Sequence, residues 1–472
     1  MHRPTMRQRG VAALVATMTI VIVPASTVVL APATTAAARP RRPNVVFILL
    51  DDLRADMFDR MPTLQRRIVA KGMTFTNAFA PNSTCCPSRT SFLSGDYSHT
   101  TGVWGNKAPF GGFDVFDDSR TLATRLDAAG FRTGLFGKYL NGYSKGDAPY
   151  IPPGWDRWWA HTSGGSVSAY YGFDVSDQGR YTVYDHRHST RVGAEQAAQF
   201  ISSTPRSRPF FLMWTPLAPH QPAQPEPRYE GRFQDIPPLR PPSYDERDMS
   251  DKSGWLRDQP PILARKRRFL DQLRIDMYET LLTADDGVEI LLHALGRRIS
   301  NTIIVFAGDN GFAFGEHRLQ GKPFAYDAVS SIPFVVRYDP LTGKRRSTNR
   351  SVVANIDLAP TISALTGAAH PDVDGLSLVP VLAGRSRAVR NALVLEHLQA
   401  RRSPAYCATR TKSWLYVDYG LEGSELYDYR KDPYELLDRA GRRSLRGRVE
   451  RMRGFARARC DPTPPGFVWD DG

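Results

Sequence analysis

Polar side chains that could bind a metal ion or move a proton follow three apolar runs of the sequence. They are two aspartates, a histidine and an Asp-Asn pair: Asp51, Asp52, His220, Asp309 and Asn310. In open α/β sheets, ligands collect outside the carboxyl ends of the strands, so we expect these side chains to meet at one edge of a sheet. Carboxylate and carboxamide oxygens suit a hard divalent cation, Ca²⁺ or Mg²⁺, and the sequence has no His/Cys spacing that indicates zinc.

Two adjacent cysteines mark a second candidate site. The run Cys-Cys-Pro-Ser-Arg at residues 85–89 is predicted to lie in a polar loop just before a helix at residues 90–93. On the cysteines alone, this is a buried thiol pair, a reactive thiolate, or a disulfide partner for Cys407 or Cys460. Because a helix N-terminus beside an arginine favours anions, binding of an anion is the leading interpretation.

The elements that must position these residues follow an α/β pattern. Four continuous apolar runs are typical of strands buried on both faces, and they cover residues 44–50, 209–214, 302–306 and 332–336. Between them, Leu273, Met277 and Leu281 recur at helical spacing within a helix predicted over residues 269–295. This alternation predicts a largely parallel sheet covered by helices.

A long proline-rich segment separates the second strand from that helix. Residues 219–261 contain ten prolines and almost no periodicity. Loops of this length in compact domains are usually functional or disordered. We interpret the segment as a rim or lid over the site, with a simple surface insertion as the alternative.

The sequence changes character after about residue 385. Short strands are predicted at residues 392–396 and 413–418, and a basic helix follows, with an apolar stripe formed by Leu445, Val449, Met452 and Phe455. Nine arginines fall between residues 439 and 459, with a single acidic residue among them. The helix is either a solvated amphipathic helix packed on a small second domain or a polyanion-binding face. We therefore predict a catalytic domain at 39–385 and a C-terminal α+β subdomain at 386–472.

The first 38 residues resemble a secretory signal. Three arginines precede an apolar stretch at residues 10–23, and Ala36-Ala37-Ala38 supplies a small-residue cleavage pattern. An uncleaved anchor is the alternative. No other segment approaches the length that spans a membrane. The mature protein is thus expected to be secreted or extracytoplasmic, without a membrane segment after cleavage, which argues against nucleic acid as a partner.

The composition narrows the class of protein and of ligand. The chain of 472 residues is 41% hydrophobic and contains 23 Phe, 8 Trp and 19 Tyr, which excludes wholesale disorder. Four cysteines are too few for a disulfide scaffold. The formal charge of +14 favours nucleic acid, an acidic surface or a polyanionic substrate as partner, and of these the expected export argues against nucleic acid.

Several motifs together resemble the type I sulfatase family, the formylglycine-dependent branch of the alkaline-phosphatase-like superfamily. In family order they are the strand and Asp-Asp at 43–52, Cys-x-Pro-Ser-Arg at 85–89, Ser-Phe-Leu-Ser-Gly at 91–95, Gly-Lys-Tyr at 137–139, Gly-Asp-Asn-Gly at 308–311, and Glu-Leu-Tyr-Asp at 425–428 with Asp432-Pro433. Residues 137–141, 150–156, 218–220 and 353–357 look most like N-acetylglucosamine-6-sulfatases and heparan sulfate 6-O-endosulfatases. The resemblance implies an alkaline-phosphatase-like fold.

The resemblance also implies a cofactor made from the chain itself. Cys85 would be oxidised to formylglycine by a formylglycine-generating enzyme, and the hydrate of this aldehyde would be the nucleophile. A plain serine would be trapped as a stable sulfate ester, whereas the hydrate can expel sulfate by re-forming its carbonyl. Asp51, Asp52, Asp309 and Asn310 would hold Ca²⁺, with Mg²⁺ as the alternative, together with the modified residue 85.

The same resemblance assigns the remaining site residues. Arg89 would stabilise the charged hydrate, and Lys138 and Lys322 would bind the sulfate oxygens. His220 is the candidate acid for the departing sugar alkoxide, assisted by Lys322. His317 is a candidate substrate-binding residue, with a capping or structural role as the alternative. Taken singly, a lysine is usually a solvated side chain and a histidine a hydrogen-bonded structural residue.

One position departs from the family pattern. Many members carry a histidine two residues after the lysine of the Gly-Lys motif, where this chain has Leu140 followed by Asn141. The base for sulfate elimination is therefore unassigned, with Asp52 as one option. Cys86 fills a free position and is expected to do no chemistry. Cys407 and Cys460, the remaining pair in an exported protein, are expected to form a disulfide.

Three functions follow from these observations. The leading hypothesis is a secreted, cation-dependent sulfatase that acts on a sulfated carbohydrate such as N-acetylglucosamine-6-sulfate. The second is a phosphodiesterase or phosphonate monoester hydrolase on the same fold. The third is a polyanion-binding protein with a degenerate site that uses the arginine-rich C-terminal helix.

Overall fold

A ten-stranded mixed sheet forms the centre of the computed structural model, which describes residues 12–20, 42–162, 169–369, 372–400 and 403–471. Its strands, in spatial order, are β12 (Ser347–Ala354), β2 (Met73–Phe79), β11 (Phe334–Arg337), β8 (Thr302–Gly308), β1 (Asn44–Leu50), β7 (Phe210–Thr215), β3 (Arg132–Gly137), β4 (Arg157–His161), β5 (Phe173–Asp177) and β6 (Arg180–Tyr184). The five central strands, from β8 to β4, run parallel. The predicted fold class is confirmed, with antiparallel pairs only towards the two edges of the sheet.

The chain divides into two units, Met1–Pro40 and Arg41–Gly472. Of the first unit the structure describes residues 12–20, which form neither helix nor strand. The rest of the predicted signal at 1–38 lies outside the described residues, so the signal stays a prediction. Within the described part of the chain, no helix is both long and apolar enough to cross a membrane.

Alternate residues of β1 build two hydrophobic cores. Successive side chains of a strand point to opposite faces of the sheet. Val46, Ile48 and Leu50 therefore join one cluster, and Val45, Phe47 and Leu49 join the other. All six are at most 1% exposed, which explains the continuous apolar run that the sequence shows.

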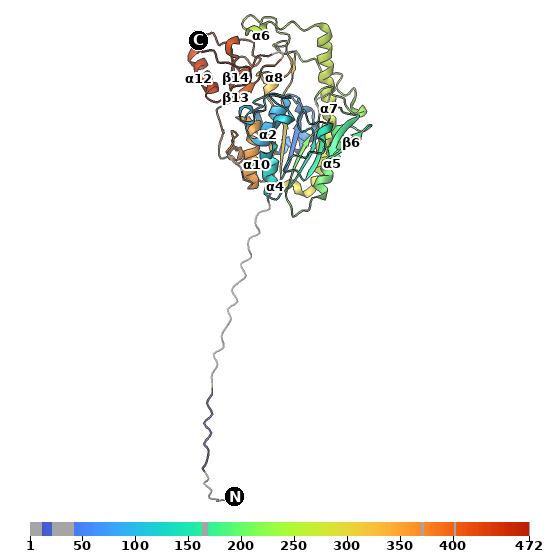
Figure 1. Cartoon of the computed structure of the whole chain (residues 1–472), viewed down its shortest axis with the longest axis vertical. Coiled ribbons are helices and arrows are strands. Elements are labelled where there is room, and N and C mark those ends of the chain that lie inside the picture. Colours follow the sequence, from blue (N-terminus) through green and yellow to red (C-terminus); the bar gives the residue numbers. More distant parts are fainter. Residues whose placement is uncertain (1–11, 21–41, 163–168, 370–371, 401–402, 472) are drawn as a thin grey trace, which may run out of the picture. The chain divides into compact units, whose positions relative to one another are not determined.

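Helices cover both faces of the sheet (Figure 1). One core receives α1 (Pro62–Arg67), α5 (Ser189–Ser203) and α7 (Ala264–Leu295), and the other receives α2 (Cys85–Ser94), α4 (Leu122–Ala128) and α10 (Leu358–Thr366). Short helices connect the remaining elements: α3 (Ser98–Thr101), α6 (Gly254–Arg257), α8 (Asp327–Ser330), α9 (Asp339–Thr342) and α11 (Val379–Leu382).

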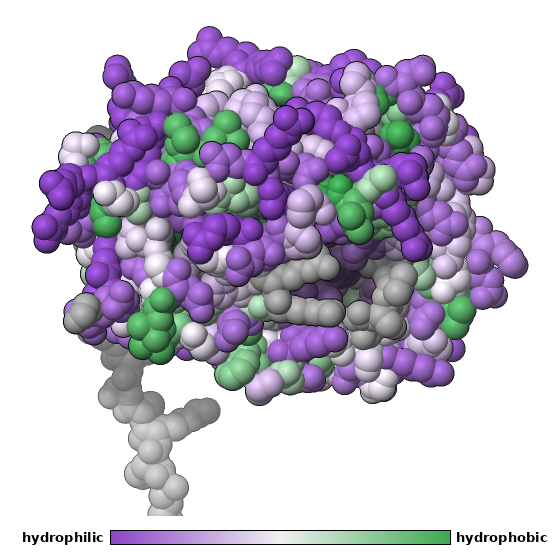
Figure 2. Space-filling view, turned by 90° about the horizontal axis from the view of Figure 1, so that it is seen from above, coloured by the Kyte–Doolittle hydropathy of each residue, from purple (hydrophilic) through white to green (hydrophobic). Residues whose placement is uncertain are grey.

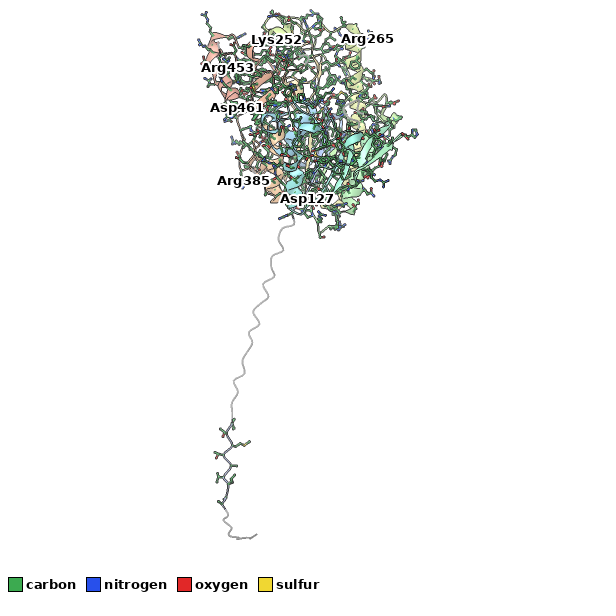
Figure 3. The ribbon with its side chains drawn as sticks, viewed as in Figure 1. Asp127, Lys252, Arg265, Arg385, Arg453 and Asp461 are labelled. Carbon is green, nitrogen blue, oxygen red and sulfur yellow. A yellow bond between two sulfur atoms is a disulfide. The ribbon has the colours of Figure 1, made fainter. Side chains whose placement is uncertain are left out.

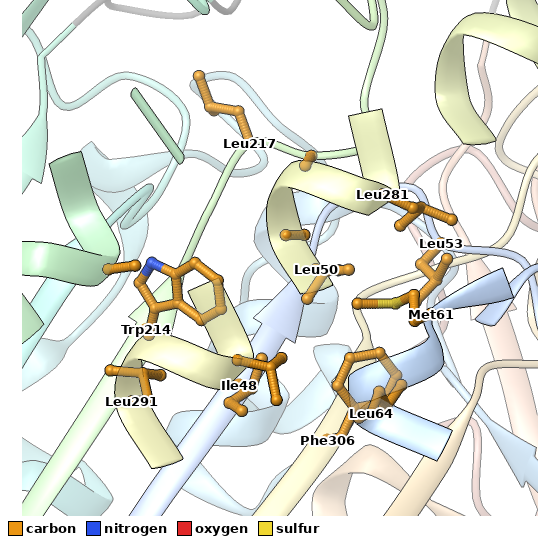
Figure 4. Packing of buried hydrophobic residues seen from close by; sticks show 14 of the residues in the cluster. Ile48, Leu50, Leu53, Met61, Leu64, Trp214, Leu217, Leu281, Leu291 and Phe306 are labelled. Carbon is orange, nitrogen blue, oxygen red and sulfur yellow. The ribbon is translucent and has the colours of Figure 1, made fainter. Parts of the chain in front are cut away.

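Helix α7 is the long crossover between the parallel strands β7 and β8, which flank β1 on either side. It begins five residues before the predicted start at Phe269, because the first turn is the basic run ARKRR, which has no apolar periodicity. The helix packs closely against the sheet at Gly287, where a Cβ atom would lie 2.2 Å from the indole of Trp214. Figure 4 shows Trp214, Leu291 and Ile48 packed between this helix and the strands.

The first turns of α7 lie at the carboxyl end of the central strands. Figure 3 labels Arg265, at the start of α7, and Asp127, in the last turn of α4, at opposite ends of the second unit. Helix α4 leads directly into the start of β3, so Asp127 marks the amino end of the strands. The proline-rich segment 219–261, which contains α6 and a 3₁₀ turn at Pro227–Tyr229, connects β7 to this end of α7.

A second sheet, of four antiparallel strands, carries the C-terminal part of the chain. Its strands are β13 (Ala392–His397), β14 (Tyr406–Thr411), β15 (Trp414–Asp418) and β16 (Ser424–Asp428). Met452 of α12 (Arg446–Arg457) is buried on this sheet, with Leu445 and Val449 packed beside it. The basic helix therefore has the packed apolar stripe that its sequence indicates. A disulfide joins Cys407 to Cys460. The domain boundary at residue 385 stays a prediction.

Candidate active site

Six elements bring their polar ends to one place at the carboxyl edge of the sheet. Asp51 and Asp52 follow β1, Asp309 and Asn310 follow β8, and the chain after β7 leads to His220. Three further elements contribute Lys138 after β3, Lys322 after the two-residue strand β10 (Gln320–Gly321), and Cys85 and Arg89 on α2. Of the sequence candidates, these nine come together.

Asp51 lies at the centre of the charge cluster. It is completely buried, with Oδ2 2.5 Å from Lys138 Nζ and 3.3 Å from Arg89 Nη2, and Oδ1 3.5 Å from Cys85 Sγ. Burial acts to raise the pKa of this carboxyl. The surrounding positive charges outweigh burial and hold the pKa well below its ordinary value; they belong to Lys138, His220, Arg89 and Lys322. Asp51 is thus an anion across the neutral pH range.

Asp52 points to the same place because the backbone turns at this residue, two positions after β1. Successive side chains of a strand would diverge, but Asp52 adopts a left-handed conformation with φ 60°. Its amide donates a 2.9 Å hydrogen bond to Asp309 Oδ1, and its Oδ1 accepts a 2.8 Å hydrogen bond from Asn310 Nδ2 and contacts Lys322 Nζ. The strained backbone is therefore held by the loop that follows β8.

Helix α2 begins at Cys85 itself, which corrects the predicted start at Thr90. Pro87, at the third helical position, does not prevent this start, because the amides of the first turn have no partner inside the helix. Ser88 N makes the first helical hydrogen bond, to Thr84 O at 3.0 Å. Cys85 is 1% exposed, and burial followed by the nearby Asp51 carboxylate raises the pKa of its thiol to about 11. The unmodified thiol is therefore protonated at neutral pH and is a poor nucleophile.

Arg89 joins the two acidic loops from the next turn of α2. Its Nε donates to Asp309 Oδ2 at 2.9 Å, and its Nη1 donates to Lys138 O at 2.9 Å. Nη2, which faces Asp51, has no hydrogen-bond partner within the described residues, although the side chain is only 1% exposed. A buried guanidinium nitrogen of this kind has room for one more acceptor, such as an anion oxygen.

The backbone around Lys138 is fixed by a close approach between β3 and β7. At Gly137, with φ 123°, a Cβ atom would lie 2.1 Å from Thr215 O, so only glycine fits there. The Thr215 hydroxyl donates to Lys138 O at 2.7 Å. Strand β3 is absent from the apolar runs of the sequence because Gly134 and Gly137 interrupt it; Lys138 is found only through its motif.

His220 forms the outer wall of the site. Its Nδ1 donates to the carbonyl of Gln221 at 2.6 Å, and its Nε2 lies 3.6 Å from Asp52 Oδ2. Because a carbonyl oxygen only accepts, Nδ1 carries a proton, and Nε2 can donate only when the ring holds both protons. The side chain is 20% exposed and also lines a cavity of about 440 Å³.

Lys322 contacts residue 85 directly. Its Nζ lies 2.8 Å from Cys85 Sγ, contacts Asp52 Oδ1, and lies 3.4 Å from Asn310 Oδ1. Burial acts to lower the pKa of Lys322, but the charges of the nearby carboxylates, chiefly Asp52, outweigh burial and raise this pKa well above its ordinary value. It is therefore a permanent cation at the reactive position.

His317 lies apart from this cluster. It is completely buried, with Nδ1 2.6 Å from Glu246 Oε2 and Nε2 3.6 Å from Glu435 Oε2. Burial disfavours the charged ring, but the hydrogen bonds and charges of these two acids outweigh it and raise the pKa of His317 to about 9. The placement fits the structural alternative, in which His317 ties the proline-rich segment to the C-terminal part of the chain.

The positions around the second cysteine contribute packing. Cys86 is buried, and its Sγ accepts a 3.0 Å hydrogen bond from Asn141 N. Leu140 is 4% exposed and belongs to the hydrophobic cluster on the α2 face of the sheet. An apolar side chain at position 140 supplies no base.

The donor set fits an oxygen-preferring cation. One ligand atom from each of Asp51, Asp52, Cys85 and His220 lies within 4.8 Å of the others, and Asp309 and Asn310 contact this group through Asp52. The three carboxylates face the three cations Arg89, Lys138 and Lys322, so the formal charges balance. Carboxylate and amide oxygens at this density are typical ligands of Ca²⁺ or Mg²⁺.

Two supporting contacts were missed by the sequence reasoning. Arg54, 8% exposed, donates from Nη1 to Phe312 O and to Glu316 Oε1, at 3.0 and 2.6 Å, and so ties the Asp51-Asp52 loop to the segment after Asn310. Asn355 donates from Nδ2 to Ser88 O at 3.1 Å and thereby holds α2. Asn355 lies inside the motif at 353–357, so the signal was present, whereas Arg54 has no sequence signal beyond its place next to the Asp-Asp pair.

Two family models match the chain. The model described as "Sulfatase" covers residues 43–368, and the model described as "N-sulphoglucosamine sulphohydrolase, C-terminal" covers residues 315–453. The first spans more than half of the chain and includes all nine clustered residues.

Individual sulfatases are also similar to this chain. The extracellular sulfatase SULF-1 homolog of Drosophila melanogaster is 32% identical over 75% of this chain, a match that spans about a third (32%) of that longer relative. The N-acetylglucosamine-6-sulfatase of Capra hircus is 32% identical over 77% of this chain and 68% of its own length. A solved structure, described as a complex with its substrate D-glucosamine-2-N,6-O-disulfate, superposes with a TM-score of 0.79 over 90% of this chain and 99% of that one, at 24% identity, and shows the same fold.

The buried ion pairs of His317 predict a dependence of stability on pH. The pKa of His317 is about 9 in the folded protein and about 6.5 when unfolded, so its stabilising contribution is complete below pH 6.5 and is lost as the pH rises through 9. Between pH 6.5 and 9.5, the free energy of unfolding should therefore fall more in the wild type than in His317→Gln, by on the order of 3 kcal/mol. Urea unfolding at several pH values measures this difference.

The exposed His186 offers a matched control. His186→Gln should follow the wild-type curve across the same pH range. If His317→Gln shows the same slope as the wild type, the pairing with Glu246 and Glu435 does not hold a proton on the ring.

Proposed function

The chain belongs to the sulfatase family, and we propose that it is a sulfuric ester hydrolase that removes sulfate from a sulfated sugar, such as N-acetylglucosamine-6-sulfate. The observation that carries this proposal is the surroundings of residue 85. This buried position has Lys322 Nζ 2.8 Å from its sulfur and Asp51 Oδ1 3.5 Å from it, and Arg89 and Lys138 lie against the same aspartate. A dianionic or monoanionic ester is the ligand that such a set of cations can bind.

Three side chains would bind the sulfate group. Lys138 lies against Asp51, Lys322 lies against residue 85, and Arg89 Nη2 is a buried donor that has no hydrogen-bond partner within the described residues. Their positions are fixed in advance by Asp51, Asp52 and Asp309, so little reorganisation is needed as charge develops on the sulfate oxygens. In this role they lower the barrier by electrostatic stabilisation.

A divalent cation and a formylglycine formed from Cys85 would complete the site. Asp51, Asp52, Asp309 and Asn310 would hold a divalent cation, and a formylglycine-generating enzyme would act on Cys85. When present, the formylglycine supplies a nucleophilic oxygen where the buried thiol cannot, and the cation withdraws charge from a sulfate oxygen. The high pKa of the Cys85 thiol supports the need for such a modification.

His220 would give its proton to the leaving oxygen. Its Nδ1 is held by the Gln221 carbonyl, which orients Nε2 towards the acidic cluster at 3.6 Å from Asp52. A sugar alkoxide is a poor leaving group, so protonation by an oriented acid matters more for it than for a phenolate. Lys322, next to residue 85, would assist from the other side of the ester.

The proposed substrate and cellular location are based on the named relatives and on the predicted signal. The goat relative is named for N-acetylglucosamine-6-sulfate and the second family model for a sulfated glucosamine, which supports a sulfated carbohydrate as substrate. The predicted signal at 1–38 and the extracellular sulfatase homolog of Drosophila support secretion. We therefore place the activity outside the cytoplasm, without nucleic acid as a partner.

The turnover of model esters tests this proposal. The wild-type protein should hydrolyse 4-nitrophenyl sulfate at least tenfold faster than bis-4-nitrophenyl phosphate or a phenyl phosphonate, and EDTA should abolish the activity until Ca²⁺ is restored. The Cys85→Ala variant should lose more than 10³-fold in kcat, since the nucleophile is missing. Faster hydrolysis of the phosphorus esters would instead favour a phosphodiesterase or phosphonate monoester hydrolase.

The same assay addresses the non-enzyme alternative. If the wild type cleaves none of these esters while heparin binding is equal in the wild type and Cys85→Ala, the chain is a polyanion-binding protein with a degenerate site.

Replacement of His220 should depend on the leaving group. His220→Ala is expected to lower kcat about 10²- to 10³-fold for an alkyl or sugar sulfate, but less than tenfold for 4-nitrophenyl sulfate, whose phenolate leaves without a proton. Steady-state kinetics with both esters measure the ratio. His186→Ala, at an exposed histidine, should leave both rates unchanged. Equal losses on the two esters would remove His220 from the role of acid.

A further inference from the structure

A cavity of about 440 Å³ adjoins the catalytic cluster at His220. One wall is residues 220–222, and the other is a face of α7. That face consists of Phe269, Gln272, Leu273 and Asp276, which follow one another at the i, i+3, i+4 and i+7 spacing of a single helical face. The volume lies in the range of small-molecule sites, about 300–1,000 Å³.

The cavity has apolar walls and one polar corner. Phe269 is 49% exposed, an unusual position for a phenylalanine, and Leu273 is buried behind it. Figure 2 shows a largely hydrophilic surface on which hydrophobic side chains lie in small separate patches. At the other end of the face, Gln272 Nε2 donates to Asp276 Oδ1 at 2.8 Å, so an amide and a carboxylate are held together beside the cavity.

The wall formed by α7 is firmly anchored to the rest of the protein. Asp285, nine residues after Asp276 on the same helix, accepts hydrogen bonds from Thr63 N and Leu64 N at 2.8 Å each. At Gly287 the helix touches the indole of Trp214 on β7. Because both contacts fix the register of α7, the face at Phe269–Asp276 is preformed.

We infer that this cavity binds the sugar ring of the leaving alcohol, an inference that rests on the proposed function. An acid that protonates the leaving oxygen must touch it, so the rest of the alcohol has to lie beside His220. Of the nine clustered residues, His220 is the one that also lines the cavity, so the cavity is the space next to the acid in which the ring can lie. Phe269 packs against the apolar C–H face of a pyranose, and Gln272 and Asp276 hydrogen-bond its hydroxyl groups.

The charge of the lining also specifies the ring. Among the described residues that line the cavity, Asp276 is the one carboxylate, and none is lysine or arginine. A second sulfate on the ring would meet Asp276, and the one other charge that the lining could offer, protonated His220, is engaged with the leaving oxygen, whereas an uncharged acetamido group meets no such repulsion. The cavity therefore favours N-acetylglucosamine-6-sulfate over the same sugar with an N-sulfate.

Two substitutions test the subsite by a split between KM and kcat. Phe269→Ala should raise KM for N-acetylglucosamine-6-sulfate about tenfold with kcat within threefold of wild type. Asp276→Asn should raise KM for the sugar several-fold. It should leave KM for 4-nitrophenyl sulfate unchanged, because that ester has no hydroxyl groups. It should also narrow the preference for the N-acetyl over the N-sulfo sugar. Leu263→Ala, at a 75%-exposed apolar residue just before α7, is the control and should stay within twofold.

Binding separates failure of the subsite from failure of the proposed function. The Cys85→Ala variant cannot turn over substrate, so calorimetric titration with N-acetylglucosamine-6-sulfate measures binding alone. Adding Phe269→Ala to it should weaken binding about tenfold, and adding Leu263→Ala should not. If the wild type hydrolyses no ester but this difference is seen, the subsite stands and the proposed reaction does not. Absence of sugar binding, or equal binding with and without Phe269, overturns the subsite.

Discussion

Six charges, five of them buried and one partly buried, lie at one edge of the sheet and have to balance one another. Asp51, Asp52 and Asp309 are at most 1% exposed, and the cations that face them are Arg89, Lys138 and Lys322. An isolated charge in such surroundings costs several kcal/mol, and removal of one member of a buried pair commonly costs about 3–5 kcal/mol because its partner is left unpaired. The cluster is thus stable only when every element that contributes to it ends at the right place.

This constraint explains why the surrounding structure is so closely determined. Gly137 allows β3 to approach Thr215 so that Lys138 reaches Asp51, and the left-handed Asp52 turns a second carboxylate to the same point. Helix α2 starts at Cys85 and so delivers both the reactive position and Arg89 from one short segment. The same cations that neutralise the carboxylates are then available to a sulfate group, so the balance that permits burial also creates the anion site.

Much of this could be predicted from the sequence, for reasons that depend on the residue. The runs that became β1, β7 and β8 are buried on both faces, so their composition reveals them and places the acids at their ends. Strand β3, interrupted by Gly134 and Gly137, gives no such signal, and Lys138 was found only through its motif. The start of α2 at Cys85 is hidden in the sequence, because residues 85–89 have the polar character of a loop and Pro87 is tolerated only in a first turn.

Tertiary contacts limit the rest of the prediction. A sequence shows that His317 is a histidine but not that Glu246 and Glu435, distant along the chain, meet it in the interior. The cavity arises in the same way, because residues 220–222 and the face of α7 at Phe269–Asp276, distant along the chain, come together only in the folded protein. The overall charge of +14 is a weaker guide, because the site is neutralised within itself and nine of the arginines lie between residues 439 and 459. The contacts of the cluster converge on residue 85, so the most direct test is the mass of the peptide that contains this residue, measured on catalytically active protein. We expect an aldehyde in place of the thiol. An intact cysteine in protein that still hydrolyses sulfate esters would contradict the proposed role of residue 85.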